Sequence, residues 1–284
     1  MFDSPLRYPG GKGRLSQYVI ELIEMNDLVG GHYVEPYAGG AGIAISLLYL
    51  EYVSHIHLND LSKSVFSFWH SVKTEPEALC RLVRDTPISV REWKRQKAIQ
   101  TSPDADTLAL GFSTFFLNRT NRSGIIRGGI IGGKKQTGAW KIDARFNRAG
   151  LIQRIEKIAS YGPRISLYNK DAAEFLTTSL KAIPKSALVY LDPPYYSKGQ
   201  KLYENHYQHG DHAKIALLVG AIRQKWIVSY DNSPALCKLY SRYRRQTFDL
   251  LYSAQTHYTG DEVMIFCDDL KTPGAVEPFR GIAA

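Results

Sequence analysis

The sequence predicts an α/β protein whose mainly parallel sheet ends in an antiparallel hairpin and is interrupted by a mainly helical insertion. Short apolar strand patterns alternate with helical patterns in the first 60 residues and again after residue 160, as they do in βαβ units. Between these parts the spacing is mainly helical, apart from a stretch rich in glycine and arginine. We therefore expect one domain formed by residues 1–60 and 161–284, with residues 61–160 inserted as a second domain.

The first part of the chain contains a strand, a glycine-rich turn, a helix and a second strand. The strand GHYVEP (31–36) enters the turn YAGGAG (37–42), and IAISLLYLEYV (43–53) follows as a buried helix, because most of its faces are apolar. The second strand, HIHLND (55–60), ends in an acid. This order of elements is half of a nucleotide-binding βαβ unit.

The inserted part begins with three segments of helical spacing, SVFSFWHSV, PEALCRLVR and VREWKRQKAIQ. ALGFSTFFLNRT then leads into the stretch rich in glycine and arginine, and RFNRAGLIQRIEKIAS follows as an amphipathic helix. We expect these segments to form a helical region that carries a basic loop.

After the insertion, strands and helices alternate again. Strands are expected over ISLYNKD, ALVYLDPPY and KWIVSYDN, and helices over AAEFLTTSL and HAKIALLVGAIRQ, with Asp211 as the N-cap of the latter. LYSAQTHYTGDEVMIF (251–266) predicts a hairpin with its turn around Gly260 and Asp261.

The composition is that of a globular protein. The 284 residues suffice for a sizeable core, and no apolar run approaches the roughly 18 residues of a membrane span. The N-terminal segment lacks the apolar core of a signal peptide. Three widely spaced cysteines without a CxxC pair fit a reducing compartment: Cys80, Cys237 and Cys267. We therefore expect a cytoplasmic protein without a membrane partner, present as a monomer or weak dimer.

The net charge of +9 is concentrated in one segment. Residues 111–155 contain nine basic residues and one acid, Asp143, which gives 9 − 1 = +8 for this segment alone. Such a concentrated positive field suits a polyanion such as nucleic acid, although a solvated charged surface would have the same composition.

The glycine-rich turn predicts a site for a nucleoside. A dinucleotide fingerprint starting at Gly40 would need glycine or alanine at its sixth position, where this chain has Ile45, so NAD and FAD are disfavoured. No lysine or arginine lies between residues 32 and 51 to meet a pyrophosphate. S-adenosylmethionine fits better, although a tight turn beside a surface acid would look similar. The expected contacts are Glu35, Ala38, Gly39, Gly40, Gly42 and Asp60.

A second motif, Asp192-Pro193-Pro194-Tyr195, ends a predicted buried strand. The carboxyl ends of parallel strands meet at one edge of a sheet, so Asp192 should face the same crevice as Asp60. The prolines leave backbone carbonyls free to accept hydrogen bonds, and Tyr195 supplies a flat ring. These groups suit a planar base with an exocyclic amine, because Asp192 and the Pro193 carbonyl could hold both N–H groups while Tyr195 stacks on the base.

The sequence resembles the Dam-like DNA adenine methyltransferases, in the group whose target-recognition segment lies between the cofactor half and the DPPY motif. The resemblance covers most of the chain, and its motifs occur in this order: RYPGGK, VEPYAGGAG, LND, FFLNRTNRSGI, DAAEFL, LDPPYY and WIVSYDN. It implies a Rossmann-like S-adenosylmethionine-dependent methyltransferase fold, with seven strands and a reversed last hairpin. It also implies direct methylation of the 6-amino group of a flipped-out adenine in double-stranded DNA.

The resemblance also implies roles for single residues. Tyr8, Lys12, Asp60 and Asp192 would border the cofactor, Asp171 would meet its adenine, and Asp192 to Tyr195 would hold the target base. We assign DNA contacts to the basic residues Arg119, Arg122, Arg127, Lys134 and Lys135. The enzymes specific for GATC have aromatic residues where this chain has Thr120-Asn121-Arg122. The recognition sequence is therefore open, and so is the existence of a cognate restriction enzyme.

Several other interpretations stay open at the level of sequence. Methylation of RNA adenine or of the cytosine 4-amino group would use similar parts, and a DNA-binding regulator could retain the fold without turnover. Trp140 and Phe146 could stack on bases or belong to the core. His206, His209 and His212 are spaced like metal ligands, but no further ligand pair accompanies them, so we expect no metal.

Overall fold

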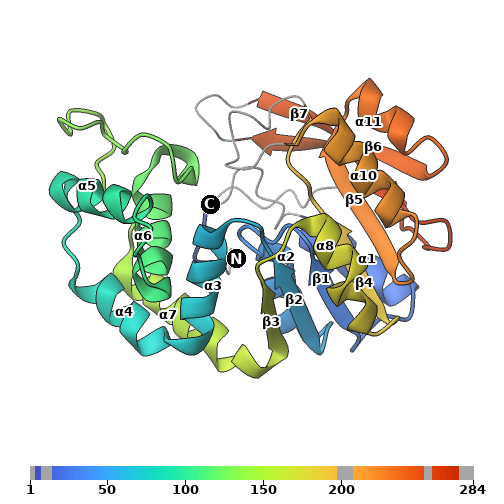
Figure 1. Cartoon of the computed structure of the whole chain (residues 1–284), viewed down its shortest axis with the longest axis horizontal. Helices are drawn as coiled ribbons and strands as arrows, with labels where there is room; N and C mark the ends of the chain where they lie inside the picture. The colour runs from blue at the N-terminus through green and yellow to red at the C-terminus, as the bar shows by residue number, and fades with distance from the viewer. Residues whose placement is uncertain (1–3, 8–14, 197–206, 253–257, 275–284) are drawn as a thin grey trace.

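The computed structural model describes residues 4–7, 15–196, 207–252 and 258–274. Its centre is a sheet of order β3-β2-β1-β4-β5-β7-β6 (Figure 1). The strands are β1 His32–Glu35, β2 His55–Asn59, β3 Ile165–Tyr168, β4 Ala187–Leu191, β5 Lys225–Asp231, β6 Arg244–Tyr252 and β7 Tyr258–Phe266. Neighbours among β1 to β5 pair in parallel, whereas β7 runs antiparallel to both β5 and β6. The predicted mixed sheet with a reversed final hairpin is confirmed.

The strand order places the reversal of the sheet between β1 and β4. From β1 the chain moves outward through β2 to β3 and then returns to β4 on the other side of β1. All five residues of β4 are buried, as expected for a strand covered on both faces. Ligands of such sheets bind beyond the carboxyl ends of the strands at the point of reversal. In this chain, that point lies where Glu35 ends β1 and Asp192 follows β4.

Two local predictions for the C-terminal part are wrong. Gly260 and Asp261 lie inside β7, where they pair with Leu250 and Asp249, so the hairpin turn lies before them. Pairing along nine-residue strands outweighs the local turn preference of a Gly-Asp pair. Helix α10 (His209–Val219) begins earlier than expected, and Gln208 is its N-cap.

Asp211 is the third residue of α10 and completes a capping box. Its carboxylate accepts a hydrogen bond from the backbone N–H of Gln208 at 2.8 Å. The acid therefore stabilises the helix start as expected, but from inside the helix. The remaining helices beside the sheet are α1 Ser16–Met25, α2 Gly42–Tyr49, α8 Ala172–Thr177 and α11 Pro234–Leu239.

The inserted segment is helical, as predicted. It contains α3 Lys63–Thr74, α4 Pro76–Asp85, α5 Val90–Ile99, α6 Thr107–Thr120 and α7 Arg148–Ser160, which gather beside the β3 edge of the sheet (Figure 1). Short 3-10 helices lie at Arg122–Gly124, Gly162–Arg164 and Ser179–Ala182. Gly111 lets α6 approach α3 closely, since a Cβ there would lie 2.6 Å from the Ser67 carbonyl oxygen. The treatment of residues 61–160 as a separate domain stays a prediction.

None of the helices in the described ranges has the length and apolar character needed to cross a membrane.

Candidate active site

The DPPY turn is fixed to the neighbouring strand through Asp192. The Ser229 hydroxyl on β5 donates to Asp192 Oδ1 at 2.8 Å, and Ser229 Oγ also lies 2.9 Å from the Tyr190 hydroxyl of β4. One residue after the motif, the Tyr196 N–H donates to Asp231 Oδ1 at 2.9 Å. Side chains of β5 therefore hold both ends of the turn, and the Asp192 carboxylate has a fixed orientation at the carboxyl end of β4.

Tyr195 is buried against the hairpin. Its side chain is 5 % exposed, and its hydroxyl donates to Glu262 Oε1 on β7 at 2.8 Å. Glu262 is itself 1 % exposed. The hydroxyl therefore locks the ring to the last strand, and stacking of this ring on a base stays a prediction.

The glycine-rich turn is tied to Asp60. Gly39 and Ala41 both adopt left-handed backbone conformations, with φ of 46° and 47°, as the chain turns from β1 into α2. The Gly39 N–H donates to Asp60 Oδ2 at 2.9 Å, and the Ser62 N–H donates to Asp60 Oδ1 at 2.9 Å. The Trp69 indole N–H donates to the Gly39 carbonyl at 2.9 Å. Asp60 thus orders the turn that it was expected to face, while its contact with a cofactor stays a prediction.

Asn59 joins three of the segments that form the site, and sequence reasoning missed it. Its side chain is fully buried, and its Nδ2 donates to the carbonyls of Pro36 at 2.9 Å and Lys170 at 3.0 Å. Its Oδ1 accepts from the Lys170 N–H at 3.1 Å. The Ala38 N–H also donates to the backbone carbonyl of Asn59 at 2.9 Å. The sequence signal that could have identified it is the position of Asn59 at the end of a buried strand, directly before Asp60, because a buried polar side chain needs hydrogen-bond partners.

Glu35 is buried at the end of β1, beside the start of α2. Burial raises the pKa of Glu35 from its ordinary value of 4.5 to about 8, and the negative charge of Asp192 adds to the rise. The Ala44 backbone N–H acts in the opposite direction. Glu35 ends β1 and Asp192 follows β4, and these strands pair in parallel, so the two predicted carboxylates stand on neighbouring strand ends at the point where the sheet reverses.

The Glu35 pKa predicts a pH-dependent stability. Between pH 4.5 and 8 the folded state holds one proton more than the unfolded state, so the free energy of unfolding should fall as pH rises through this window. The fall should be on the order of 4 kcal/mol. Denaturant unfolding of the wild type and of Glu35→Gln at pH 5 and pH 8.5 measures it. The difference in the free energy of unfolding between the wild type and Glu35→Gln should change by this amount between the two pH values. A difference that stays constant with pH would contradict the prediction.

Asp171 lies at the same edge of the sheet and caps α8. Its Oδ1 accepts from the Ala173 N–H at 3.0 Å. Burial raises the pKa of Tyr207 to about 12, and the charges of Asp171 and Asp60 add to the rise. The Tyr207 hydroxyl lies 3.0 Å from that of Tyr37, the first residue of the glycine-rich turn. The structure therefore brings Asp60, Asp171 and two tyrosines together, and sequence reasoning did not identify the tyrosine pair.

His212, one of the three histidines with metal-like spacing, is buried among aromatic rings. Its Nδ1 lies 3.2 Å from the Tyr230 hydroxyl, and its ring contacts those of Tyr196 and Tyr207. Within the described ranges, no group of three potential ligands could hold a metal ion. The predicted residues Tyr8, Lys12 and His206 lie outside the described ranges.

The structure separates the basic residues into two groups. Arg119 is 8 % exposed and its Nε donates to the Pro5 carbonyl at 2.7 Å, while Arg148 donates to carbonyls at the end of α4, including Thr86 at 2.7 Å. The other group has exposed side chains: Arg122, Arg127, Lys134, Lys135, Lys141 and Arg145. This second group carries the exposed positive charge of residues 111–155.

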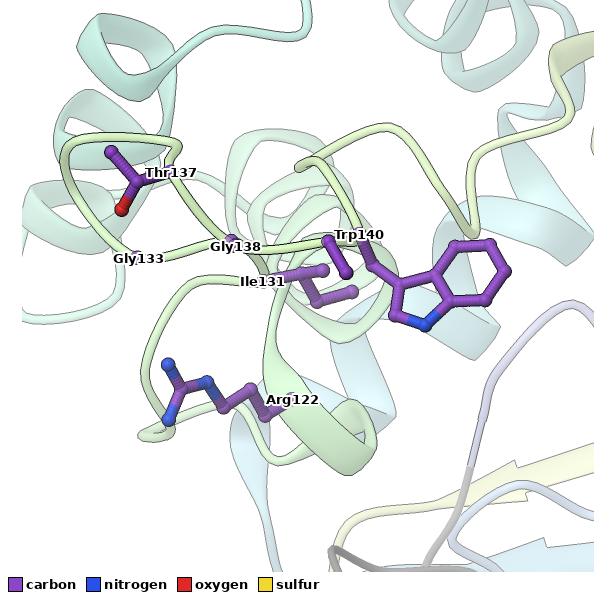
Figure 2. Close-up of a pocket in the computed structure, with 8 residues that line it drawn as sticks. Arg122, Ile131, Gly133, Thr137, Gly138 and Trp140 are labelled. Carbon is purple, nitrogen blue, oxygen red and sulfur yellow. The ribbon is translucent and has the colours of Figure 1, made fainter.

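An open cavity of about 430 Å³ lies in the basic loop (Figure 2). Arg122, Ile131, Gly133, Thr137 and Trp140 are among the residues that line it. Phe146 is buried, whereas Trp140 is 68 % exposed. Of the two roles considered for these aromatic residues, Phe146 therefore belongs to the core, whereas Trp140 does not.

Asn118 connects the basic loop to the N-terminal segment. Its Nδ2 donates to the Arg7 carbonyl at 2.6 Å and to the Gly124 carbonyl at 2.8 Å, and its Oδ1 accepts from the Arg7 N–H at 2.7 Å. Arg7 is the first residue of RYPGGK, the motif expected at the cofactor. One buried amide thus holds the start of the loop beside Arg7.

The comparisons with known proteins give one family match. The model of the D12 class N6 adenine-specific DNA methyltransferase family matches residues 8–258. No curated protein sequence matches the chain.

Among solved structures, a putative RNA methyltransferase from Pyrococcus horikoshii has 11% identity and a TM-score of 0.42, covering 92% of this chain and 84% of its own. A putative class I S-adenosylmethionine-dependent methyltransferase from Listeria monocytogenes has 12% identity and a TM-score of 0.40, and the match covers 92% of this chain and 62% of the Listeria chain. The rRNA methyltransferase AviRa from Streptomyces viridochromogenes has 10% identity and a TM-score of 0.39, with 91% and 85% covered. At these values we draw no conclusion from the structural similarities. The family match, which spans most of the sequence, shows that this chain belongs to the D12 class of N6 adenine-specific DNA methyltransferases.

Proposed function

We propose that the chain transfers the methyl group of S-adenosylmethionine directly to the 6-amino group of an adenine extruded from double-stranded DNA. Family membership supports the reaction class. The observation that carries the residue-level proposal is the placement of Asp192. Its carboxylate follows β4, accepts a hydrogen bond from Ser229 and stands beside the strand that Glu35 ends, where the sheet reverses.

The residues around the glycine-rich turn fit this cofactor. Glu35, Asp60 and Asp171 offer carboxyl oxygens, which suit ribose hydroxyls, an adenine amine and positively charged groups. No lysine or arginine lies between residues 32 and 51, where it would repel a sulfonium. We assign the ribose to Asp60, the cofactor adenine to Asp171 and the remaining contacts to the turn from Ala38 to Gly42. Tyr8 and Lys12 complete the proposed set.

Bound S-adenosylmethionine supplies an electrophilic methyl group on its sulfonium. Asp192 accepts a hydrogen bond from one N–H of the target amine, and the Pro193 carbonyl accepts a hydrogen bond from the other. These two bonds turn the nitrogen lone pair toward the methyl group and stabilise the positive charge that develops on nitrogen as the carbon–sulfur bond breaks. Asp192 need not be a strong base, because the proton on the methylated nitrogen is acidic and can leave to solvent.

Residues 61–160 are the proposed target-recognition region. The exposed basic residues Arg122, Arg127, Lys134 and Lys135 would contact phosphates and base edges, and the buried Arg119 would act by holding the N-terminal segment. A metal-free reaction, a cytoplasmic location and a monomer or weak dimer stay predictions.

Modified-base sequencing tests the proposal. Genomic DNA is sequenced from a methylation-free bacterial host that expresses the wild type or Asp192→Ala. We expect N6-methyladenine within one short motif in the wild type and none in the variant. Unmodified genomic DNA, from a host in which the folded protein binds S-adenosylmethionine, would overturn the DNA substrate and favour RNA or a binding-only regulator. Modified cytosine would overturn the choice of adenine.

A further inference from the structure

Trp140 differs from the other three tryptophans of the chain. Trp69, Trp93 and Trp226 are 3 %, 6 % and 3 % exposed, whereas Trp140 is 68 % exposed. A large apolar ring exposed in this way loses the free energy that burial would provide, unless a partner covers it. The exposure of Trp140 therefore indicates a partner that covers the indole.

Side-chain hydrogen bonds to backbone groups order the loop around Trp140. The Gln136 side chain donates to the carbonyls of Ile131 at 2.7 Å and Gly133 at 2.6 Å, and it accepts from the Ile142 N–H at 2.8 Å. The Lys141 ammonium donates to the Gln136 and Gly138 carbonyls at 2.8 and 3.0 Å.

The loop is also anchored in the core. Ile130, Ile142 and Phe146 are buried on either side of Trp140. A Cβ at Gly132 would lie 2.7 Å from the Trp140 carbonyl oxygen, so the backbone crosses itself closely at this point. The exposed indole is therefore held on an ordered support, which reduces the entropy lost when a partner binds it.

Positive charge lies beside the indole. The Arg145 guanidinium lies 5.7 Å from the centre of the Trp140 ring. Burial is the main cause that lowers the pKa values of Arg7 and Arg119, and the charge of Arg145 adds to both shifts. In the described part of the chain, none of these three arginines forms an ion pair with a carboxylate. A flat apolar surface within a positive field matches a nucleobase whose neighbouring phosphates meet the cations.

The geometry also separates the indole from the arginine that lines the same cavity. Figure 2 shows the Trp140 ring and the Arg122 side chain extending in different directions. The exposed indole is therefore accessible to a base face that the DNA itself presents.

We propose that Trp140 stacks on the base face left open in the duplex when the target adenine is extruded. This inference rests on the proposed function, because an intact duplex shows open base faces only at its ends. Extrusion removes stacking on both sides of the target, and an indole on the exposed face restores part of it. The ring would thereby favour the extruded state without any contact to the reacting amine.

An abasic duplex tests this without methyl transfer, since its vacancy exists whether or not the protein extrudes a base. We measure binding of two short duplexes of the same sequence, one intact and one with a central abasic site. The wild type is expected to bind the abasic duplex about 10-fold more tightly. Trp140→Ala should lose this preference, and Trp140→Phe should keep most of it. Leu217→Ala removes another exposed apolar side chain, on α10, and should bind like the wild type.

The salt dependence separates stacking from charge. Trp140→Ala should leave the slope of log K against log[salt] unchanged, whereas Lys134→Gln should reduce the slope by about 1 and keep the abasic preference. Quenching of the exposed tryptophan fluorescence by the abasic duplex should disappear in Trp140→Phe. An abasic preference that survives in Trp140→Ala would overturn the inference. If Trp140→Ala keeps the abasic preference but genomic DNA is methylated in the sequencing experiment, only the inference about Trp140 fails and the proposed function stands. If the abasic preference depends on Trp140 but no DNA is methylated, the proposed function fails.

Discussion

Replacing Asp192 with asparagine is expected to lower the methylation rate about 1000-fold at saturating cofactor. Asparagine retains the size of the side chain and the acceptor oxygen for Ser229, but it removes the charge that stabilises the developing ammonium. The rate is measured as transfer of radioactive methyl groups to DNA from a methylation-free host. Because the Ser229 hydroxyl on β5 donates to Asp192 Oδ1, Ser229→Ala should cause an intermediate loss of about 10-fold by loosening the carboxylate.

A matched control is Asp268→Asn, which removes one carboxylate charge from an exposed position near the end of the described chain. Its methylation rate should equal that of the wild type. Circular dichroism and thermal unfolding should show that all three variants are folded. A fully active Asp192→Asn protein would contradict the assignment of Asp192 to the target amine.

Replacing Asn59 with alanine is expected to lower the free energy of unfolding by about 3 kcal/mol and the melting temperature by about 6 °C. The variant leaves the Pro36 carbonyl and both backbone groups of Lys170 without their side-chain partner in a fully buried position. The measurement is urea unfolding, followed by circular dichroism, of the protein without ligands.

Asn169→Ala provides the comparison for Asn59. This exposed asparagine also donates to backbone carbonyls, those of Asp60 and Leu61, at 2.7 and 3.1 Å. Water can replace the amide at an exposed position, so the variant should lose less than about 1 kcal/mol. Equal losses for the two variants would show that burial of Asn59 is not what makes its hydrogen bonds important.

Much of the fold could be predicted because its signals are local and periodic. Among the long helices of the insertion, α6 is buried on most of its faces, whereas the others have an apolar stripe of helical period, which determines their type within a few residues. The parallel strands are short, largely apolar runs bounded by turn residues. The acids Asp60 and Asp192 stand directly after such runs. Their common location followed from the rule that parallel strands end at one edge of a sheet.

The predictions that failed depended on contacts with distant segments. Gly260 and Asp261 have the composition of a turn, but pairing with Asp249 and Leu250 incorporates them into β7. Asp211 has the chemistry of an N-cap, yet α10 begins two residues before it and uses it inside the first turn. In both cases the local preference is worth about 1 kcal/mol, and the summed hydrogen bonds of a longer element outweigh it.

The sequence by itself determined the class of fold, the order of the motifs and the concentration of positive charge in residues 111–155. Only the tertiary structure decided which of those side chains can meet DNA, because exposure depends on what other segments cover. Arg119 is buried against Pro5, 114 positions away, while Trp140 remains uncovered. The same reason applies to Asn59, which reaches Lys170 across 111 positions, and to Glu35, whose raised pKa reflects burial. A residue's type fixes the chemistry it can perform, but the packing of the whole chain fixes its solvent exposure, its partners and its protonation.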